Sequence, residues 1–367
     1  MSIVKVGLIG IGIMGKVYAH QLDKAQVNGA MLTAVCGREK QSEWVKDNLS
    51  ANVKFYTDED TFFNDSELDA VIIATPHFSH PDLAIKAFAK GIHVLLEKPA
   101  GVFTKNVLEM NEAAVASGKT FAMMYNQRTN PMFQKSRSLI QSGELGEIKR
   151  TNWISTDNYR SQSYYDSSSW RATWSGEGGG VLLNQAPHQL DLMQWTTGME
   201  LKNVHAFCHS GKYHNIEVED DVTAYFQYEN GATGVFISST GEAPGTNRFE
   251  VVGDRGKLVI ENNKLTFFRL TQSEREFNAT YKGGFGEPEA WKIDIPVKGE
   301  YLNHIGIIQN WIDAILKDTP LLSPGDEGLK VVEMVNAIYL SSWLKQTVEI
   351  PVDPDEYLKL LHEKMDS

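Results

Sequence analysis

The chain of 367 residues is poor in cysteine, has no long hydrophobic run and carries an excess of acidic side chains. Its two cysteines, Cys36 and Cys208, exclude a disulfide-rich scaffold and a cysteine-rich zinc or iron–sulfur site, and they fit a reducing compartment. Lys and Arg number 35 against 47 Asp and Glu, so the formal net charge is −12. Because polyanions would meet net repulsion, we expect neither nucleic acid nor an anionic membrane as a partner.

No stretch approaches the ~18 apolar residues that a membrane-spanning helix needs. Met1–Val4 lacks the basic residues of a signal peptide, and Lys5 interrupts the first apolar run. We therefore expect a cytoplasmic protein. Hydrophobic residues make up 42% and charged residues 22% of the chain. This is ordinary globular composition, and the length suggests about two domains.

Short apolar runs alternate with stretches of helical spacing through the first third of the chain. The runs are Ile3–Gly10, Met31–Cys36, Val53–Tyr56, Ala70–Ala74, His93–Leu96 and Thr120–Tyr125. Strands that alternate with helices form βαβ units, and nearly continuous hydrophobicity is typical of parallel strands buried on both faces. The pattern predicts an α/β domain with a doubly wound parallel sheet over residues 1–126.

The pattern changes after Arg128. Helical spacing covers Pro131–Gln141 and Val181–Trp195, and Asn230-Gly231 between alternating runs predicts a β-hairpin. Further strands follow, and two helices close the chain over Leu302–Lys317 and Pro324–Lys345, the second capped by Ser323. We predict a second, α+β domain with an antiparallel sheet over residues 127–367.

A glycine motif follows the first strand and opens the first helix. It reads Gly10-Ile11-Gly12-Ile13-Met14-Gly15. In this strand–turn–helix context the first glycine permits a tight turn, the second admits a pyrophosphate, and the third lets helix and strand pack closely. The motif predicts that Gly10, Gly12, Ile13, Met14 and Gly15 bind NAD(P) in the first domain.

The end of the second strand favours NADP(H) over NAD(H). An NAD site usually has an acidic residue there, which binds the ribose 2′-hydroxyl. Gly37 occupies the position, followed by Arg38 and, two residues later, Lys40. A small residue followed by bases suits a 2′-phosphate. The alternative is that Arg38 is a solvated loop residue and that Glu39 reaches the ribose.

Polar residues also follow the fourth strand, at the sheet edge where such folds bind ligands. Thr75, Pro76 and His77 end the strand, and His80 begins the next helix. We expect these residues beside the cofactor. For His80, a role as a polar residue at a helix start is an equal alternative.

Glu97-Lys98-Pro99 ends the fifth strand at the same edge. A lysine there would project toward the nicotinamide, where it could donate to a substrate hydroxyl or exchange a proton with it. We assign Glu97 and Lys98 to the cofactor site and Lys98 also to catalysis. The alternative is an ordinary surface lysine at a strand end.

A second polar group follows three glycines in the second domain. Within Gly178–Asp191, Asn184 and His188 are four residues apart and would share one face of a single helix. Asp191, three residues beyond His188, could also touch it. A histidine that titrates near neutrality is a natural base for an alcohol, although a lone histidine more often packs in the interior.

Aromatic residues cluster before these glycines, with Arg160 and Arg171 among them. The aromatic residues are Trp153, Tyr159, Tyr164, Tyr165, Trp170 and Trp174. Flat rings and hydrogen-bond donors suit the apolar faces and polar edges of sugars. We expect about half of the set to pack in the core, and we assign Trp153, Tyr159, Trp170 and Arg171 to substrate binding.

Together these motifs, with Tyr125-Asn126-Gln127-Arg128, resemble the glucose–fructose oxidoreductase / inositol dehydrogenase / MocA-type (Gfo/Idh/MocA) oxidoreductases over essentially the full chain. The resemblance implies a Rossmann domain followed by a domain with an open, mostly antiparallel sheet that makes homo-oligomer contacts, in a dimer or tetramer. It also implies oxidation or reduction of sugars, cyclitols and related polyols with NAD(P), no metal, and a cis bond before Pro99.

The family's lysine and histidine fall on Lys98 and His188. The family often has an aspartate four residues before the histidine, where this chain has Asn184. We expect a substrate with a secondary hydroxyl to dock between the domains, His188 to take the proton and Lys98 to stabilise the oxygen, although these two roles could be exchanged. Asn184, Asn126, Arg128 and Asp191 would position nearby groups.

Two other functions fit the same resemblance. One is a non-catalytic sensor that binds a dinucleotide, although such relatives tend to lack the lysine and histidine. The other is a redox-assisted enzyme whose tightly bound cofactor transiently oxidises a glycoside, for example at ring C3. Because Asn184 stands where the family often has an aspartate, a glycoside remains an alternative substrate.

Overall fold

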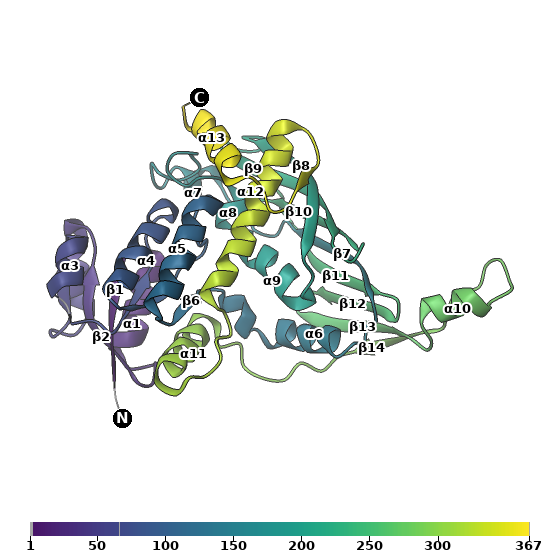
Figure 1. The fold of residues 1–367 in the computed structure, drawn as a ribbon, viewed down its shortest axis with the longest axis horizontal. Coiled ribbons are helices and arrows are strands. Elements are labelled where there is room, and N and C mark those ends of the chain that lie inside the picture. The colour runs from purple at the N-terminus through teal and green to yellow at the C-terminus, as the bar shows by residue number, and fades with distance from the viewer. Residues whose placement is uncertain (1–2, 66, 367) are drawn as a thin grey trace. The chain divides into compact units, whose positions relative to one another are not determined.

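The computed structural model describes residues 3–65 and 67–366. The chain forms two compact units, one running up to Thr129 and including Leu302–Val332, the other comprising Asn130–Tyr301 and the chain from Glu333 onward. The predicted second domain, residues 127–367, is therefore interrupted by a segment that belongs to the first unit. Each unit has its own sheet (Figure 1).

The first unit contains a six-stranded parallel sheet. Its strands are β1 (Val4–Ile9), β2 (Ala30–Cys36), β3 (Lys54–Tyr56), β4 (Ala70–Ile73), β5 (His93–Leu96) and β6 (Phe121–Met123). The order β3-β2-β1-β4-β5-β6 is that of a Rossmann fold, which confirms the predicted doubly wound sheet. The order reverses between β1 and β4, so the carboxyl ends of these strands mark the expected ligand crevice.

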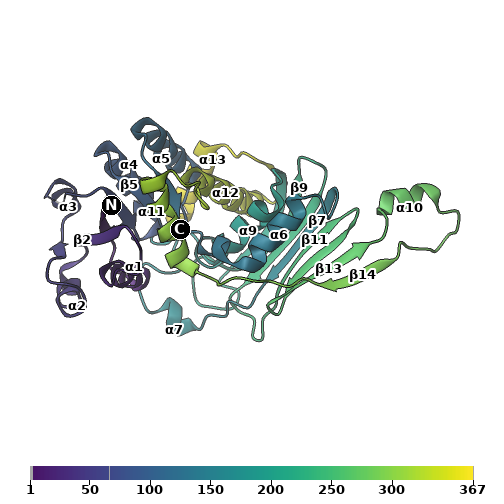
Figure 2. The ribbon, with the colours of Figure 1, turned by 90° about the horizontal axis from the view of Figure 1, so that it is seen from below.

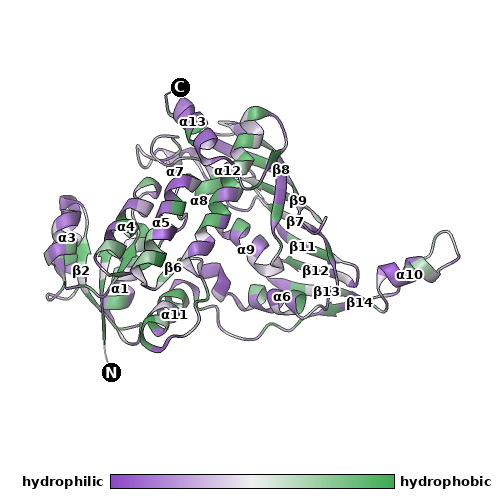
Figure 3. Ribbon diagram, viewed as in Figure 1, coloured by the Kyte–Doolittle hydropathy of each residue, from purple (hydrophilic) through white to green (hydrophobic). Residues whose placement is uncertain are grey.

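Helices cover the sheet of the first unit. They are α1 (Ile13–Asp23), α2 (Ser42–Asn48), α3 (Glu59–Asp65), α4 (His80–Ala89), α5 (Thr104–Ser117) and α11 (Asn303–Lys317), with short 3₁₀ turns η1 (Glu39–Gln41), η2 (His77–Ser79), η3 (Asn126–Thr129) and η4 (Gly325–Glu327). The strands are mostly hydrophobic (Figure 3). Trp311 and Ile308 of α11 are fully buried in the same core as Leu8 and Tyr18, which explains why residues 302–332 join this unit.

The second unit contains a nine-stranded sheet. Its strands are β7 (Ile148–Ser155), β8 (Leu201–Ser210), β9 (Glu219–Tyr228), β10 (Thr233–Ser239), β11 (Asn247–Gly253), β12 (Gly256–Glu261), β13 (Lys264–Leu270), β14 (Ala290–Asp294) and β15 (Val348–Glu349), in the order β14-β13-β12-β11-β7-β10-β9-β8-β15. Only the β7–β10 pair is parallel among these neighbours, so the expected mostly antiparallel sheet is confirmed.

The second unit also contains helices. They are α6 (Pro131–Gln141), α7 (Gln162–Tyr165), α8 (Val181–Asn184), α9 (Pro187–Thr197), α10 (Glu274–Thr280) and α13 (Pro354–Met365), and α12 (Gly328–Leu344) begins in the first unit and ends in the second. Both α6 and α9 lie against the sheet, whereas α10 projects beyond β13 and β14 (Figure 2). On the covered face, Trp153 of β7 stacks between Phe133 and Phe249, with ring centroids 5.9 and 4.2 Å away.

Two predicted helices differ from the structure, each at a proline. The expected helix Val181–Trp195 is divided into α8 and α9, because Pro187 has no N–H for a helix interior and instead begins α9. The expected helix from Pro324 begins only at Gly328. Residue Pro324 is extended and forms an isolated antiparallel bridge with Ala122 of β6.

Candidate cofactor and substrate sites

The turn between β1 and α1 has the geometry of a diphosphate cradle. Gly10 has a φ of +97°, and a Cβ there would overlap the carbonyl oxygen of Ala74. A Cβ at Gly15 would overlap the carbonyl oxygen of Gly10, whereas a Cβ at Gly12 would meet no atom within 4 Å. Gly12 caps α1 without a side-chain hydrogen bond, so the first N–H groups of the helix are not capped by a side chain. These residues fit the diphosphate of a dinucleotide.

The loop after β2 is built around Gln41, which the sequence analysis missed. Its Nε2 donates to the Ile11 carbonyl oxygen (2.6 Å), and its Oε1 accepts from the Arg38 N–H (2.7 Å). A Cβ on Gly37 would come within 2.6 Å of Gln41 Oε1, so the glycine makes room for this amide. Arg38 and Glu39 are both exposed. The polar side chain four residues after a strand-end glycine was the available signal.

His80 joins the loops that follow β4 and β5. It is fully buried, its Nδ1 lies 2.7 Å from the Pro99 carbonyl oxygen, and its Nε2 lies 2.8 Å from that of Thr75. Burial lowers the pKa of His80. Thr75 Oγ1 also accepts from Ser79 Oγ (2.7 Å). His80 therefore fixes two loops at the carboxyl edge of the sheet, and neighbouring His77 is also buried.

Lys98 follows β5, and its bond to Pro99 is cis, as expected. Glu97 is buried, accepts a hydrogen bond from the Tyr18 hydroxyl and accepts another from the Lys98 backbone N–H at 2.9 Å. Burial raises the pKa of Glu97, against the opposing effect of the Lys98 charge. The carboxyl thus orients the backbone from which Lys98 projects.

His304, at the start of α11, belongs to the Lys98 environment and was missed from the sequence. Burial and then the positive charge of Lys98 lower the pKa of His304 to about 4. Its ring centroid lies 5.7 Å from that of Tyr18. His304 is therefore neutral at neutral pH and adds no charge beside Lys98. Its chain position, within the predicted second domain, concealed it.

Asn126 and Arg128, predicted to position substrate, also make framework contacts inside the first unit, and their role toward substrate stays a prediction. Both are nearly fully buried. Asn126 Nδ2 donates to Asn303 Oδ1. Arg128 Nη1 donates to the Leu322 carbonyl oxygen (3.1 Å) and forms an ion pair with Glu327. These bonds attach residues 302–332 to η3.

A buried carboxylate lies beside Asn184 in the second unit. Glu177 is 2% exposed, and its Oε1 accepts a hydrogen bond from Asn184 Nδ2. Its Oε2 accepts from the Ala172 N–H (2.7 Å), and Arg171 Nη1 lies 3.9 Å from its Oε1. Sequence reasoning missed Glu177, although a lone acidic residue directly before the glycines was a signal.

The Tyr164 hydroxyl stands at the centre of this group. It accepts from Arg171 Nη1 (2.8 Å), and Asn184 Nδ2 and Gln185 Nε2 lie 3.3 and 3.4 Å away. The Arg171 guanidinium packs on two rings, with its central carbon 4.6 Å from the Tyr164 centroid and 4.8 Å from that of Trp170. The structure thus brings together Asn184, Arg171 and Trp170 from the predicted site.

A second buried carboxylate anchors the glycine block. Glu219 accepts from the N–H groups of Gly180 and Leu182, both at 2.9 Å, and from the Tyr339 hydroxyl at 2.8 Å. Burial raises the pKa of Glu219 to about 7. A Cβ at Gly180 would overlap the Glu219 backbone oxygen, so close approach of β9 requires this glycine.

The other predicted substrate residues have diverse surroundings. Trp153 is 2% exposed within the core, so it faces Phe133 and Phe249 and not solvent. Tyr159 is 52% exposed. His188 and Asp191 both lie on α9, the first half-buried and the second buried. Since Asn184 is on α8, the shared helix face expected for Asn184 and His188 is not formed.

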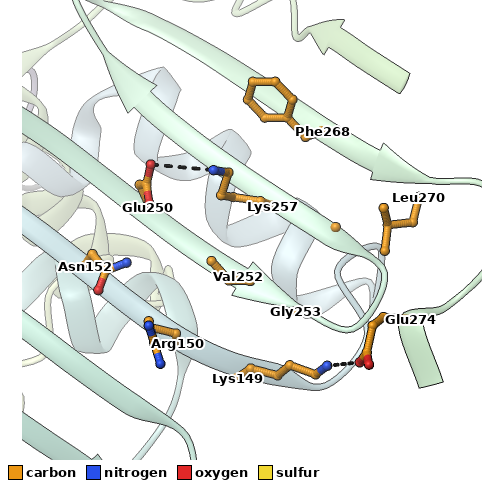
Figure 4. Close-up of a pocket in the computed structure, with 11 residues that line it drawn as sticks. Lys149, Arg150, Asn152, Glu250, Val252, Gly253, Lys257, Phe268, Leu270 and Glu274 are labelled. Carbon is orange, nitrogen blue, oxygen red and sulfur yellow. Dashed lines mark hydrogen bonds and ion pairs between the residues drawn. The ribbon is translucent and has the colours of Figure 1, made fainter. Parts of the chain in front are cut away.

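A surface pocket of about 610 Å³ lies on the sheet of the second unit (Figure 4). Strands β7, β11, β12 and β13 contribute most of its lining, including Arg150, Asn152 and Phe268. Ion pairs Lys149–Glu274 and Glu250–Lys257 lie along it. Arg150 and Asn152 alternate with the buried Trp153, so the pocket is on the sheet face away from the core. None of the predicted site residues lines it.

No helix within residues 3–65 and 67–366 combines the length and hydrophobicity needed to cross a bilayer. The cytoplasmic location stays a prediction. Over the same residues, no group of three or more His, Cys, Asp or Glu is arranged to hold a metal ion.

Several known dehydrogenases are similar to this chain over most of its length. The myo-inositol 2-dehydrogenase of Thermotoga maritima is 25% identical over 76% of this chain and 81% of its own. The levoglucosan dehydrogenase of Pseudarthrobacter phenanthrenivorans is 25% identical over 96% of this chain and 99% of its own. The WlbA dehydrogenase of Chromobacterium violaceum, solved with NADH and UDP-GlcNAcA, superposes with a TM-score of 0.81 at 25% identity, covering 96% of this chain and 97% of that one.

Two family models match consecutive parts of the chain. The oxidoreductase family with an NAD-binding Rossmann fold matches residues 4–125, which include the glycine cradle and Lys98. The Gfo/Idh/MocA C-terminal domain matches residues 133–259, which include Glu177, Asn184 and His188. Both halves of the resemblance are therefore confirmed, and the chain belongs to the Gfo/Idh/MocA family of NAD-binding oxidoreductases.

Proposed function

We propose that this protein is an NAD(P)-dependent dehydrogenase or reductase that acts on a secondary hydroxyl or ketone of a sugar, cyclitol or glycoside. The observation that carries the proposal is the carboxyl edge of the first sheet, where the open cradle at Gly12 follows β1 and Lys98 follows β5, with β4 between these two strands. Relatives named for inositol and levoglucosan support the substrate class.

The cofactor is held by the turn from Gly10 to Gly15. The N–H groups that begin α1 would hold its diphosphate, with no side chain at Gly12 to exclude it. When bound, NAD(P) supplies the hydride acceptor or donor at its nicotinamide ring. Thr75 and Pro76, fixed by the buried His80, line the same edge.

NADP(H) is preferred slightly over NAD(H). Exposed Arg38 and Lys40 follow Gly37, and the side chain that fills this corner is the neutral amide of Gln41, not a carboxylate. A 2′-phosphate would meet a guanidinium without a fixed negative charge at the strand end. The test is Arg38→Ala, which should raise KM for NADP more than KM for NAD. An equal effect on both would contradict the preference.

Lys98 and His188 handle the proton of the reacting hydroxyl. Lys98 donates a hydrogen bond to the oxygen and stabilises its developing negative charge, an effect that is large when the donor is preorganised. Glu97 holds the Lys98 backbone, and His304, neutral at neutral pH, adds no second positive charge beside the ammonium. His188 takes the proton as general base. Asp191, three residues on along α9, orients it.

The remaining substrate contacts come from the Trp170–Arg171–Asn184 group and from exposed Tyr159. Ring faces pack against sugar C–H groups, and Arg171 and Asn184 contribute hydrogen bonds to hydroxyls. We leave Trp153 and Arg128 out of this proposed set, because both side chains are buried and make framework contacts within their units.

The protein also forms a homo-oligomer, a dimer or tetramer, through the uncovered face of the nine-stranded sheet. Phe207 of β8 and Tyr225 of β9 are 59% and 42% exposed. They alternate with buried Ala206 and Ala224, so they lie on the face away from the core, beside outward Val235. Apolar side chains gathered on a regular sheet face favour a self-complementary contact.

The activity is tested by incubating purified protein with a panel of polyols and glycosides, with NAD and NADP in parallel, and following reduced nicotinamide by absorbance. Lys98→Met should lower kcat at least about 100-fold while leaving cofactor affinity nearly unchanged. Lys90→Met, at the exposed end of α4, is the matched control and should keep full activity. Near-normal turnover by Lys98→Met would refute the assignment.

A further inference from the structure

We propose that the Tyr164 hydroxyl is a substrate-recognition group, donating a hydrogen bond to a hydroxyl or ring oxygen of the sugar or cyclitol. The proposal rests on the proposed function, because it names a residue of the same substrate site. It assigns to Tyr164 a role in selecting which oxygenated substrates turn over.

The first reason is the direction of the hydrogen bonds around the phenol. Arg171 Nη1, Asn184 Nδ2 and Gln185 Nε2 converge on the Tyr164 oxygen, and all three are N–H donors. None of these nitrogens can accept a proton. The phenol oxygen therefore acts as acceptor toward them, and its own hydrogen points elsewhere. Within residues 3–65 and 67–366, each hydrogen bond of the Tyr164 hydroxyl has the phenol oxygen as acceptor, and none has it as donor.

The second reason is that the phenol is held in place before any ligand binds. The guanidinium of Arg171 lies on one side of the ring system at 4.6 Å, and that of Arg160 lies 5.1 Å from the same centroid. Arg160 is itself fixed by a bond to the Tyr159 carbonyl oxygen (2.9 Å). A donor held this firmly loses little conformational entropy when an acceptor binds.

The third reason is the anchoring of Arg171. Its guanidinium packs on Trp170 and approaches the buried Glu177 carboxylate, which the Ala172 N–H holds from the other side. Nε of Arg171 is buried and has no acceptor among the described residues. Two donors beside Asn184, Tyr164 O–H and Arg171 Nε–H, thus have no acceptor among the described residues. Of the two, the hydroxyl of the half-buried Tyr164 is the one that we assign to an oxygen of the ligand.

The neighbouring Tyr165 shows the contrast and provides the control. Its hydroxyl lies 2.7 Å from Thr240 Oγ1, and the residue is buried, so its hydrogen-bonding capacity is used within the protein. Tyr164 and Tyr165 are adjacent in α7, and each loses only one oxygen on replacement by phenylalanine. The comparison separates loss of a substrate contact from loss of a structural hydroxyl.

The experiment compares Tyr164→Phe with Tyr165→Phe, using the best substrate found in the panel and its deoxy analogues. A net hydrogen bond of about 1.4 kcal/mol corresponds to tenfold, so Tyr164→Phe should lower kcat/KM about tenfold, mainly through KM. It should leave NAD(P)H affinity unchanged. One deoxy analogue, which lacks the contacted oxygen, should be turned over equally by wild type and Tyr164→Phe. Tyr165→Phe should lower thermal stability while discriminating these analogues as wild type does.

Two outcomes would overturn the proposal. Unchanged kcat/KM in Tyr164→Phe, or an equal loss on every deoxy analogue, would show that its hydroxyl does not contact substrate. Failure of the underlying function looks different: the wild-type protein would then oxidise or reduce no member of the panel, and Lys98→Met would change nothing.

Discussion

The sequence predicts that Arg128 positions substrate, whereas its contacts in the structure stabilise the first unit. Replacing Arg128 with methionine distinguishes a role in substrate binding from a role in stability. Methionine keeps a long, flexible apolar side chain in the buried space but removes the guanidinium. The change eliminates the ion pair with Glu327, the bond to the Leu322 carbonyl and the stacking on Tyr125, whose centroid lies 5.3 Å away. All of these contacts connect parts of the first unit.

The expected cost follows from these contacts. Removing one partner of a buried pair costs about 3–5 kcal/mol. The Glu327 side chain is 32% exposed, so water would solvate the orphaned carboxylate and lower this cost. The charged hydrogen bond to Leu322 is worth about 1.5–3 kcal/mol and the cation–π contact about 0.5–1 kcal/mol. Because these contributions overlap, we expect a net loss near 3 kcal/mol in the free energy of unfolding.

Urea unfolding followed by circular dichroism measures this loss, and calorimetry should show Tm lower by about 6–12 °C for a domain of this size class. Where the variant is still folded, its KM for the sugar or cyclitol should match that of wild type. Arg171→Met is the opposite case and should raise KM. An Arg128→Met protein with wild-type stability and a raised KM would refute the framework assignment.

Three further predictions test other parts of the structure. Gly12→Val adds a side chain where a Cβ meets no protein atom within 4 Å, so the protein should fold normally. The variant should bind NAD(P)H at least about tenfold more weakly in a fluorescence titration, because the side chain occupies the diphosphate site. Unchanged affinity would show that the cofactor does not bind at this turn. Glu219 has a pKa of about 7 in the folded protein against 4.5 ordinarily, so the folded state holds a proton that the unfolded state has lost, and the stability contributed by this group declines as pH rises from about 4.5 to 7. Glu219→Gln, compared with wild type by denaturant unfolding across this range, should therefore gain in relative stability with rising pH, and the opposite slope would contradict the assigned pKa. Phe207→Asp combined with Tyr225→Asp should convert the proposed oligomer to monomers in light scattering, and an unchanged mass would place the contact elsewhere.

Much of the first unit was predictable because its physics is local. A strand such as Ala70–Ile73 is apolar at every position, as burial on both faces requires, and the Gly10–Gly15 spacing fixes the following turn. The return of Asn303–Lys317 was not predictable in the same way. Its amphipathic pattern predicts a helix, but any apolar surface could bury Trp311. The spacing of residues in the sequence does not say which sheet provides that surface.

The arrangement of the candidate substrate residues was less predictable than the first unit, because it depends on contacts between residues of different elements. The i to i+4 rule placed Asn184 and His188 on one helix face, yet Pro187 starts a new helix between them. Likewise, Trp153 has the composition of a sugar-binding residue, but its alternation along β7 points it into the core. Residue type suggested the chemistry of these side chains, and strand or helix phase decided where they point.

The amide at position 184 suits the buried carboxylate of Glu177. With its carboxylate 2% exposed and bonded to Asn184 Nδ2, Glu177 already places one negative charge in this buried corner. A second carboxylate at position 184 would face the first in a medium that solvates charge poorly, and one of the two would have to hold a proton. An amide avoids this repulsion, since its N–H group donates where a carboxylate would repel. The contacts with Glu177 and the Tyr164 hydroxyl also identify the nitrogen and the oxygen of the Asn184 amide, since a carboxylate can accept only from Nδ2. The buried carboxylate at position 177 thus favours an amide over a second carboxylate at position 184.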